Sequence, residues 1–340
     1  MTHAITHRPT HGWLASGRWT GLAVALAAAA VAVAINRAVP ALSPLLTCIL
    51  MGVAARHAVA RPAAWTVMQP GLAFAARRLL RAGIVLLGLQ LSLADIAAVG
   101  WTTAAGVCAV VAGGIAAAMW VGRRLGLERD QAALIACGFS ICGAAAVAGL
   151  QSVLRRPRRD EAATAIALVV LFGTLMIGVA PLAVAALGLG DRTAGVWIGG
   201  SVHEVAQVVA ASGLVGTAVL KIAVLVKLMR VLCLAPVLAG ASWLERRRGA
   251  GESGALPPPV PLFVVAFVGA VALRSTGVLP AGSVHDAATV QGLLLGAAMF
   301  ALGTSVHWTG IRAAGLRPIA VAGATTLVVA GLAAIVAAAA

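Results

Sequence analysis

Stretches of apolar residues recur along almost the whole chain, separated by short connections that are rich in arginine, glycine and proline. A run of about 20 apolar residues is long enough to cross the hydrocarbon core of a bilayer as one helix. The pattern therefore predicts an all-α integral membrane protein with about ten or eleven transmembrane helices. The expected spans are Thr20–Ile35, Leu42–Ala58, Ala82–Val99, Thr102–Val121, Gln131–Val153, Ala162–Leu187, Val196–Leu214, Ala218–Leu244, Val260–Leu273, Ala287–Val306 and Pro318–Ala339.

The composition agrees with a membrane protein. Apolar residues make up 61% of the chain and charged residues only 10%, which is more apolar surface than a soluble core uses. We expect one transmembrane domain over residues 20–340, preceded by a basic cytoplasmic tail over residues 1–19. The net charge of +15 would suit nucleic acid, but the arginines lie between spans rather than on one face of a soluble module. The lipid bilayer, and no nucleic acid, is the expected partner.

The arginines also predict an orientation, because cytoplasmic connections carry an excess of Lys and Arg. With eleven spans, most basic connections share one side with the N-terminus, which is then cytoplasmic. These connections contain Arg56, Arg61, Arg77, Arg78, Arg123, Arg124, Arg129, Arg246, Arg247, Arg248, Arg312 and Arg317. The connection "RRPRRDE" (155–161) would lie outside with four arginines. Either it is an exception, or the segment before it does not simply cross the membrane.

Glycines interrupt the span "ACGFSICGAAAVAG" (136–149), where Gly138 and Gly143 bracket Ser140 and Cys142. Glycines at this density weaken a helix and let another backbone approach closely. The pattern predicts an unwound or close-packed helix beside a binding site. Packing of small residues between helices is the structural alternative.

A second unusual span contains "GSVHEVAQVV" (200–209), with the polar residues Ser201, His203, Glu204 and Gln207. At 3.6 residues per turn, positions 200, 203, 204 and 207 form one stripe on a helix. We therefore expect these side chains to face protein or water instead of lipid. An ionisable group inside a membrane marks a transport pathway or a proton relay by default.

Two cations on a later span supply the opposite charge. Lys227 and Arg230 are three residues apart and share a helix face. If both meet Glu204 in one cavity, the sum of −1 and +2 is +1, which favours an anion. Helix N-termini at glycine-rich breaks would add positive dipole ends. In the structural alternative, one of the cations only neutralises Glu204.

The segment "HEVAQ" resembles the zinc motif HExxH but has Gln207 where the second histidine belongs. Zinc needs both imidazoles on one helix face, and glutamine is a poor substitute. Cys137 and Cys142 have the spacing of neither a CxxC redox pair nor a metal pair. The sequence predicts no metal site and no cofactor.

Four motifs carry a resemblance to a known family. They are "RAGIVLLGLQLSL" (81–93), "ACGFSICGAAAVA" (136–148), "SVHEVAQVVAA" (201–211) and "VKLMRVLCLAPVL" (226–238). In this order they resemble the YeiH family of bacterial inner-membrane proteins, which are labelled sulfate exporters, from about residue 40 to the C-terminus.

The resemblance implies a multi-pass carrier of the bacterial inner membrane, related to the cation/proton antiporter and bile-acid symporter superfamily. It implies inverted five-helix repeats over about 42–187 and 194–339, with broken helices crossing at the midplane. The breaks are then expected in Gln131–Val153 and Ala287–Val306. Where related antiporters place aspartates, this chain has Ser140, Cys142, Thr304 and Ser305, which disfavours cation exchange.

The expected function is therefore secondary transport of a small anion, sulfate or a sulfur-containing organic acid, with proton-coupled export left open. The expected coupling residues are His203, Glu204 and Gln207, because histidine titrates near physiological pH. The expected substrate-binding residues are Gly138, Ser140, Cys142, Gly143, Ser201, Lys227, Arg230 and Thr304. An anion channel and a membrane enzyme acting on a lipid or quinone are the alternatives, although no nucleophile motif supports an enzyme. A homodimer is left open.

Overall fold

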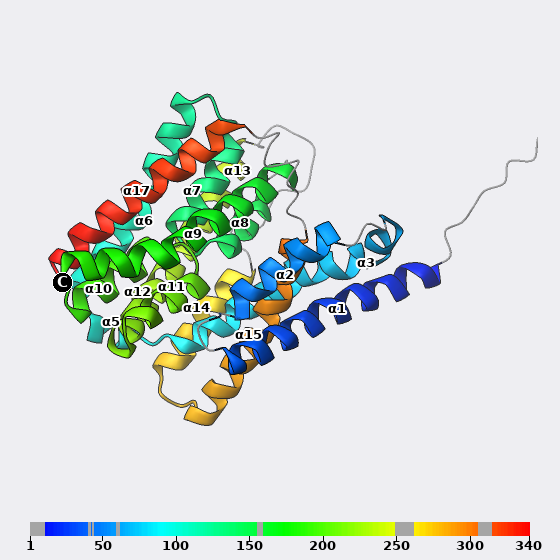
Figure 1. The fold of residues 1–340 in the computed structure, drawn as a ribbon, viewed down its shortest axis with the longest axis horizontal. Coiled ribbons are helices and arrows are strands. Elements are labelled where there is room, and N and C mark those ends of the chain that lie inside the picture. The colour runs from blue at the N-terminus through cyan, green and yellow to red at the C-terminus, as the bar shows by residue number, and fades with distance from the viewer. Residues whose placement is uncertain are drawn as a thin grey trace, which may run out of the picture.

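The computed structural model describes residues 11–39, 42, 44–58, 62–154, 159–248, 262–304 and 315–340. These residues contain no β-strand and fold almost entirely into helices (Figure 1). The helices are α1 (His11–Ala38), α2 (Pro44–Ala58), α3 (Pro62–Phe74), the π-helix η1 (Ala75–Leu79), α4 (Leu80–Leu87), the 3-10 helix η2 (Gly88–Gln90), α5 (Leu93–Val99), α6 (Trp101–Arg124), α7 (Arg129–Ser140), α8 (Ala144–Gln151), α9 (Arg159–Leu187), α10 (Asp191–Ser201), α11 (Val205–Val215), α12 (Thr217–Leu232), α13 (Leu234–Arg248), α14 (Leu262–Ser275), α15 (Ala281–Gly303) and α17 (Leu316–Ala338).

The helices confirm an all-α integral membrane protein. Within the described residues, 6 helices are long and apolar enough to cross a bilayer, or up to 7 if the bent pair Ala64–Gln90 and Leu93–Val99 forms one span. Each span expected from the sequence overlaps helical structure, so the segmentation was predictable. This number of candidate spans is lower than the ten or eleven expected from the sequence. One reason is that two expected spans, Gln131–Val153 and Val196–Leu214, are each divided into two short helices.

Two faces of the molecule are defined by helix ends that lie together. On one face, the Arg192 side chain donates to the backbone oxygens of Val99 and Ala340, over 2.7 and 2.8 Å. We call this the C-terminal face. α6 runs from it to Arg124, close to the start of α17, where Arg317 lies beside Gly126. We call this opposite side the arginine face.

The first divided span, α7–α8, is a hairpin that enters from the arginine face and returns to it; we call it hairpin 1. The Cys137 thiol lies 3.6 Å from the backbone oxygen of Ala146, whereas nine residues of continuous helix would separate them by about 13 Å. α8 therefore turns back against α7. The 29-residue helix α9 then runs from the arginine face to the C-terminal face, where α10 begins.

The second divided span, α10–α11, is a hairpin that enters from the C-terminal face; we call it hairpin 2. Along α10, Gly195 packs on Val219 and Gly199 packs on Ala223, so α10 runs parallel to α12. The Lys227 ammonium, deeper on α12, donates to the backbone oxygen of Val202 at the end of α10. α11 returns from this depth and is joined to α12 by Gly216 alone.

One expectation about these helices stays a prediction and another was wrong. α15 continues without interruption from Ala281 to Gly303, and residues 305–306 of the span in which a break is expected lie outside the described residues. Hairpin 2 holds a break that the sequence did not predict. The wrong expectation is that residues 200, 203, 204 and 207 form a stripe on one helix. The helix ends at Ser201 and restarts at Val205, with Glu204 as the N-cap residue. The division into two repeats stays a prediction.

The hairpins explain the exceptional basic connection. Because hairpin 1 returns to the arginine face, the helix ends on both sides of residues 155–158 lie on the side where α6 ends and α17 begins. The segment before "RRPRRDE" therefore does not cross the membrane, which is the second of the two explanations offered for this connection.

Arg77 and Arg78 differ from the expectation, because they lie in η1 within a helical segment and not in a connection. Arg61 and Arg312 lie outside the described residues.

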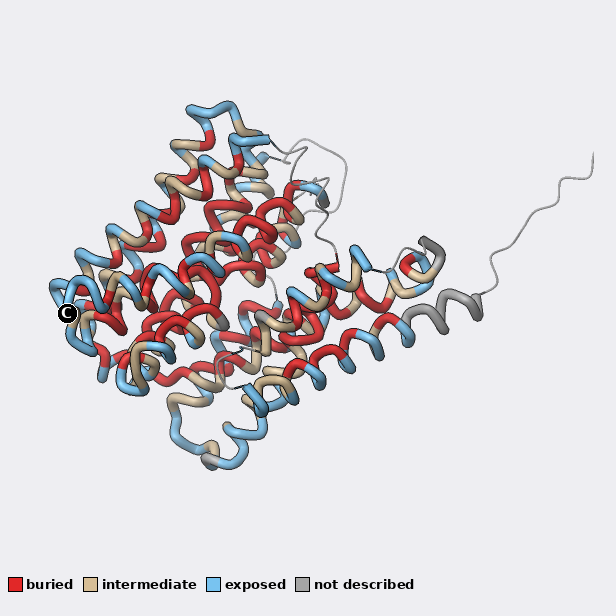
Figure 2. The backbone as a smooth tube through the Cα atoms, viewed as in Figure 1, coloured by how far each residue is buried: buried red, intermediate tan, exposed pale blue. Residues whose placement is uncertain are grey.

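The helices form two groups (Figure 1). The hairpin bundle consists of α6 to α12 and α17, and α17 packs against α6, α7 and α10. The flanking bundle consists of α1 to α4, α14 and α15, and α15 packs against α1, α2 and α4. Figure 2 shows buried segments inside both groups, and those of the hairpins lie within the hairpin bundle. The hairpins are therefore enclosed by full-length helices.

Candidate functional site

The two hairpins meet at their tips, which are residues 140–144 of hairpin 1 and 201–205 of hairpin 2. α7 has 12 residues and α10 has 11, so each measures about 17 to 18 Å, roughly half of a bilayer. Each tip therefore reaches the middle of the molecule from its own face. Of the predicted site residues, His203, Glu204, Gln207, Lys227 and Arg230 are all buried there.

The Glu204 carboxylate connects the two tips. Its Oε1 accepts a hydrogen bond from the backbone N–H of Ala144, 2.9 Å away, at the first turn of α8. Its own backbone N–H donates to Oε1 of Gln207 over 3.1 Å. The first N–H groups of a helix have no partner within the helix and carry a partial positive charge. Glu204 thus places a carboxylate at the start of α8 and at the start of its own helix α11.

Arg230 binds the opposite ends of the half-helices. Its guanidinium donates to the backbone oxygens of Phe139 at 2.9 Å and Ser140 at 3.1 Å in hairpin 1. It also donates to the backbone oxygens of Gly200 at 2.7 Å and Val202 at 3.0 Å in hairpin 2. The Lys227 ammonium donates to the same Val202 oxygen at 2.7 Å. Helix C-terminal carbonyls are partly negative, so both cations complement them.

This arrangement changes the role expected for Lys227 and Arg230. Within the described residues, neither forms an ion pair with Glu204, so the structural alternative of a directly paired carboxylate does not hold. Their donors are directed at backbone carbonyls, which fixes the hairpins to one another. The formal charges of the three groups still sum to −1 + 2 = +1. The main contacts of Lys227 and Arg230 are structural.

His203 joins the tips to α17. Its Nδ1 lies 3.2 Å from the backbone oxygen of Phe139 and must donate, because a carbonyl only accepts. Its Nε2 lies 3.1 Å from Oγ1 of Thr326. The Thr326 hydroxyl also bonds to the backbone oxygen of Ala322 at 2.9 Å. Because that hydroxyl has one proton, it donates either to Ala322 or to a neutral imidazole. Protonation of His203 is thus linked to rotation of the Thr326 hydroxyl.

Three polar atoms near the crossing have no hydrogen-bond partner within the described part of the chain. They are Oγ of Ser140, Oγ of Ser201 and Nε2 of Gln207, and all three residues are fully buried. An unsatisfied buried donor costs about 1–3 kcal/mol, so such groups require an explanation. These groups are therefore available to a bound polar molecule.

Glycines allow these groups to approach the neighbouring backbone. Gly143 has φ +76° and ψ −136°, and a Cβ there would overlap the Glu204 side chain. A Cβ at Gly173 of α9 would overlap the Gln207 amide, and one at Gly114 of α6 would lie 2.5 Å from Oγ of Ser140. Gly138 is different: it is helical, and a Cβ would press on Val147 and Val169. The unwinding prediction applies to Gly143, whereas Gly138 serves close packing.

The remaining predicted residues have different positions. Cys142 lies in the tip of hairpin 1 and is buried. Thr304 lies at the end of α15 in another cavity, and its hydroxyl bonds to the backbone oxygen of Ala301 at 2.7 Å. The structure therefore does not bring Thr304 to the hairpin tips. Ser305 lies outside the described residues.

Several contributors were missed by sequence reasoning. Glu204 and Gln207 have the spacing of an N-cap residue and its N3 partner, a signal that would have placed a helix start at Val205. Phe139, whose ring centroid lies 4.5 Å from that of His203, and Thr326 belong to apolar helices of ordinary composition. No local signal identifies these two residues, because their role arises only from packing.

Comparison with known proteins gives consistent matches. A family model described as conserved hypothetical protein 698 matches residues 20–322. The chain is 45% identical over 295 residues to a UPF0324 membrane protein of Corynebacterium glutamicum, a match that covers 86% of this chain and 84% of that relative. It is 38% identical over 286 residues to UPF0324 membrane proteins of Pseudomonas putida and Bordetella bronchiseptica, which covers 82% of this chain and 80% and 88% of those proteins. No solved structure matches the chain.

Proposed function

This chain belongs to the family described as conserved hypothetical protein 698, together with relatives named UPF0324 membrane proteins, and on that basis we propose that it is a secondary transporter of a small anion. Membership confirms the resemblance to the YeiH family, whereas the relation to the antiporter superfamily stays a prediction. The observation that carries the proposal is a set of three buried, unpartnered polar atoms, one on hairpin 1 and two on hairpin 2, which enter from opposite faces.

The geometry of the hairpins supports transport. A site between tips that come from opposite faces can be uncovered from either face by movement at one hairpin or one group of helices. Gly-interrupted half-helices that meet at mid-depth are typical of secondary transporters. Their ends carry partial charges that suit ions without large desolvation. A site of this kind would bind its substrate away from lipid.

The charge of the crossing supports an anion. Glu204, Lys227 and Arg230 sum to +1, and the unpartnered atoms include the amide donor Nε2 of Gln207 and two hydroxyls, which can also donate. We infer that Ser140, Ser201 and Gln207 contact the substrate. Lys227 and Arg230 position the hairpins and provide the positive potential. Sulfate or a sulfur-containing organic acid is the substrate that the family resemblance suggests, in the bacterial inner membrane.

The proposed coupling residues are His203 and Glu204. Glu204 contacts the backbone of hairpin 1 and belongs to hairpin 2, so a change in its protonation acts on the contact between the two tips. His203 acts between hairpin 1 and α17 through Phe139 and Thr326. Proton transfer at either residue would therefore alter the interactions that hold the site closed.

A transport assay with matched variants tests the substrate role. Purified protein in proteoliposomes is assayed for uptake of radiolabelled sulfate and of a set of sulfonates, with and without a pH gradient. Ser140→Ala and Ser201→Ala should each raise KM about tenfold or more, because each removes a hydrogen bond to a charged group. Ser212→Ala is the control, since its buried hydroxyl already bonds to Val208. Equal KM values in all three variants would contradict the assignment.

A second experiment tests coupling. Glu204→Gln keeps an acceptor for Ala144 but removes the titration, so substrate affinity should persist while flux loses its dependence on the pH gradient. If flux in Glu204→Gln keeps its full pH dependence, Glu204 is structural only.

Counterflow distinguishes a transporter from a channel, because a pore does not exchange labelled substrate against an outward gradient of unlabelled substrate. Recovery of chemically altered substrate would instead indicate an enzyme.

A further inference from the structure

A second cavity lies apart from the hairpin tips, between the two bundles. Its volume is about 1050 Å³. The face of the helix from α3 to α4 forms one wall, and the ends of α8 and α9 form the other. Because α8 ends and α9 begins at the arginine face, the cavity lies in that half of the molecule. None of the residues at the tips lines it.

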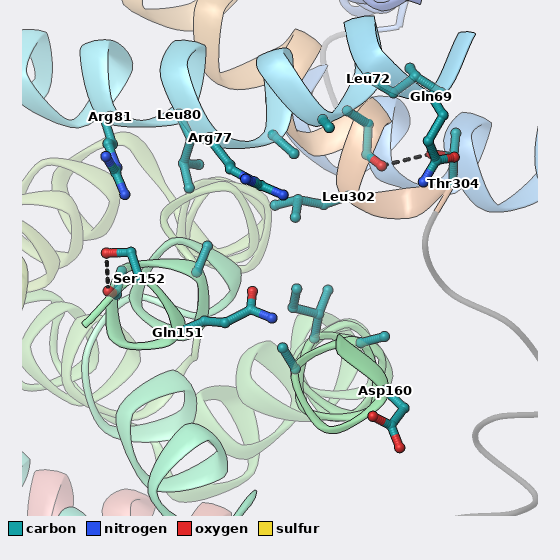
Figure 3. A pocket seen from close by; sticks show the side chains of 18 of the residues that line it. Gln69, Leu72, Arg77, Leu80, Arg81, Gln151, Ser152, Asp160, Leu302 and Thr304 are labelled. Atoms are coloured by element: carbon teal, nitrogen blue, oxygen red, sulfur yellow. Dashed lines mark hydrogen bonds between the residues drawn. The ribbon is translucent and has the colours of Figure 1, made fainter. Parts of the chain in front are cut away.

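Cations and neutral polar groups face each other across this cavity (Figure 3). Arg77 and Arg81 point inward from η1 and α4, and Gln151 and Ser152 point inward from α8. Arg77 and Arg81 are four residues apart, close to one helical turn. Within the described part of the chain, the Arg77 guanidinium and the Gln151 amide have no hydrogen-bond partner. The Arg81 guanidinium lies 5.5 Å from the centre of the Phe263 ring.

The charges of the lining favour an anion. Three arginines, Arg56, Arg77 and Arg81, line the cavity together with one carboxylate, that of Asp160. The sum is +3 − 1 = +2. Two arginines on one wall form a surface that suits an oxyanion, since guanidinium groups bind planar or tetrahedral oxygen groups in a bidentate manner.

The size and apolar surface of the cavity indicate an organic ligand. Leu72, Leu80, Ile84 and Leu302 line it beside Phe263. Pockets of about 300–1000 Å³ typically bury an organic molecule, with apolar walls and a few polar groups that fix its orientation. An inorganic ion would fill only a small part of this space. The lining therefore matches a ligand with one oxyanion group and an apolar body.

We propose that this cavity is a binding site for an organic oxyanion, with a sulfonate, carboxylate or phosphate group held by Arg77 and Arg81 and an apolar body packed on Phe263, Leu80 and Leu302. The π-helix η1 contributes, because the extra residue in its turn sets the direction of Arg77 relative to Arg81. The site does not depend on the proposed transport function, since it shares no residue with the hairpin tips.

Binding of benzenesulfonate, which combines a sulfonate with one apolar ring, tests the site. The full-length protein in nanodiscs of phosphatidylcholine is titrated calorimetrically. Arg77→Gln and Arg81→Gln should each weaken binding about tenfold or more, because each removes a charge-assisted hydrogen bond. Arg78→Gln is the matched control, since Arg78 is adjacent in sequence and exposed like Arg77 but does not line this cavity. The affinity of Arg78→Gln for benzenesulfonate should stay within about twofold of that of the parent protein, as expected for a surface charge.

Two further ligands separate the contribution of the negative charge to binding from that of the apolar ring. The neutral isostere benzenesulfonamide should bind about tenfold more weakly than benzenesulfonate because it lacks the charge, and inorganic sulfate should bind more weakly because it lacks the ring. The proposal is overturned if benzenesulfonate does not bind the parent protein. It is also overturned if Arg78→Gln weakens binding as much as Arg77→Gln. Size-exclusion profiles establish that the variants are folded, and Gln151→Leu, on the opposite wall, provides an independent variant that should also weaken binding.

The source of the natural ligand is distinguished by lipid composition. Phosphatidylglycerol offers a phosphate on an apolar body from the bilayer, whereas soluble organic anions come from the water. If nanodiscs that contain phosphatidylglycerol weaken benzenesulfonate binding in the parent protein but not in Arg77→Gln, the site binds the lipid headgroup. Unchanged binding assigns it to soluble anions. If phosphatidylglycerol abolishes benzenesulfonate binding in both the parent protein and Arg77→Gln, the cavity is not selective and the proposal is contradicted.

Discussion

Substitution of Gly143 by alanine should destabilise the protein far more than its single added methyl group suggests. Gly143 has φ +76° and ψ −136°, a backbone conformation that only glycine adopts readily. The new Cβ would also overlap the Glu204 side chain, which bonds to the backbone N–H of Ala144. The change therefore combines backbone strain with the loss of a contact between the hairpins.

The expected magnitude follows from these two parts. Holding a non-glycine residue in such a conformation costs about 1–3 kcal/mol. Displacing Glu204 removes a hydrogen bond to a charged group, worth about 1.5–3 kcal/mol. The two together lower the free energy of unfolding by roughly 2.5–6 kcal/mol, less whatever relaxation of the tip recovers.

Reversible unfolding of the purified protein measures this quantity, with Gly178→Ala as the control. Gly178 lies in α9, and a Cβ there meets no atom within 4 Å. Alanine in a helix is more favourable than glycine by about 1 kcal/mol, so this control should be neutral or stabilising.

A double-mutant cycle separates the two parts of the cost. In a Glu204→Ala background the overlap disappears, and Gly143→Ala should then cost only the backbone strain of about 1–3 kcal/mol. A cost below about 1 kcal/mol in the native background, or the same cost in both backgrounds, would refute the reasoning.

Three further outcomes are expected. Arg230→Met should lower the free energy of unfolding by about 3–5 kcal/mol, because carbonyls of both hairpins lose a buried charged donor; a loss below 1 kcal/mol in the same assay would contradict the bridging role. In a background without native cysteines, an impermeant thiol reagent applied to intact cells should label Gly190→Cys and not Ser152→Cys. The opposite pattern would contradict the cytoplasmic placement of the arginine face. Gly173→Ala should displace the Gln207 amide and reduce transport at least tenfold with normal insertion; unchanged transport would exclude Gln207 from the site.

The sequence predicted the helical segments and most of the buried polar residues that lie near the hairpin tips, because both depend on local composition. Apolar runs define membrane helices wherever they occur, and a charged residue inside a run, such as Glu204 or Arg230, is conspicuous. The hairpin turns were less accessible. A run such as Gln131–Val153 has the length of a crossing helix, and only the contact of Cys137 with Ala146 shows that it turns back.

The roles of the cations were not predictable for a different reason. The sequence shows Lys227 and Arg230 on one face of a helix, but the helix ends that they bind exist only after both hairpins have formed. Counting side-chain charges therefore suggested a partner for Glu204, while backbone carbonyls are the actual acceptors. Partial charges of half-helix ends have no counterpart in residue composition.

The link between Arg230 and hairpin 1 has a consequence for biosynthesis. The guanidinium that donates to the Ser140 carbonyl is encoded 90 residues after it. When hairpin 1 leaves the ribosome, the carbonyl end of α7 has no donor, and the bilayer interior supplies none. Hairpin 1 can therefore take its final position only after α12 has been inserted. A nascent chain that stops before α12 should remain a substrate for membrane proteases, however many of its apolar helices have already crossed.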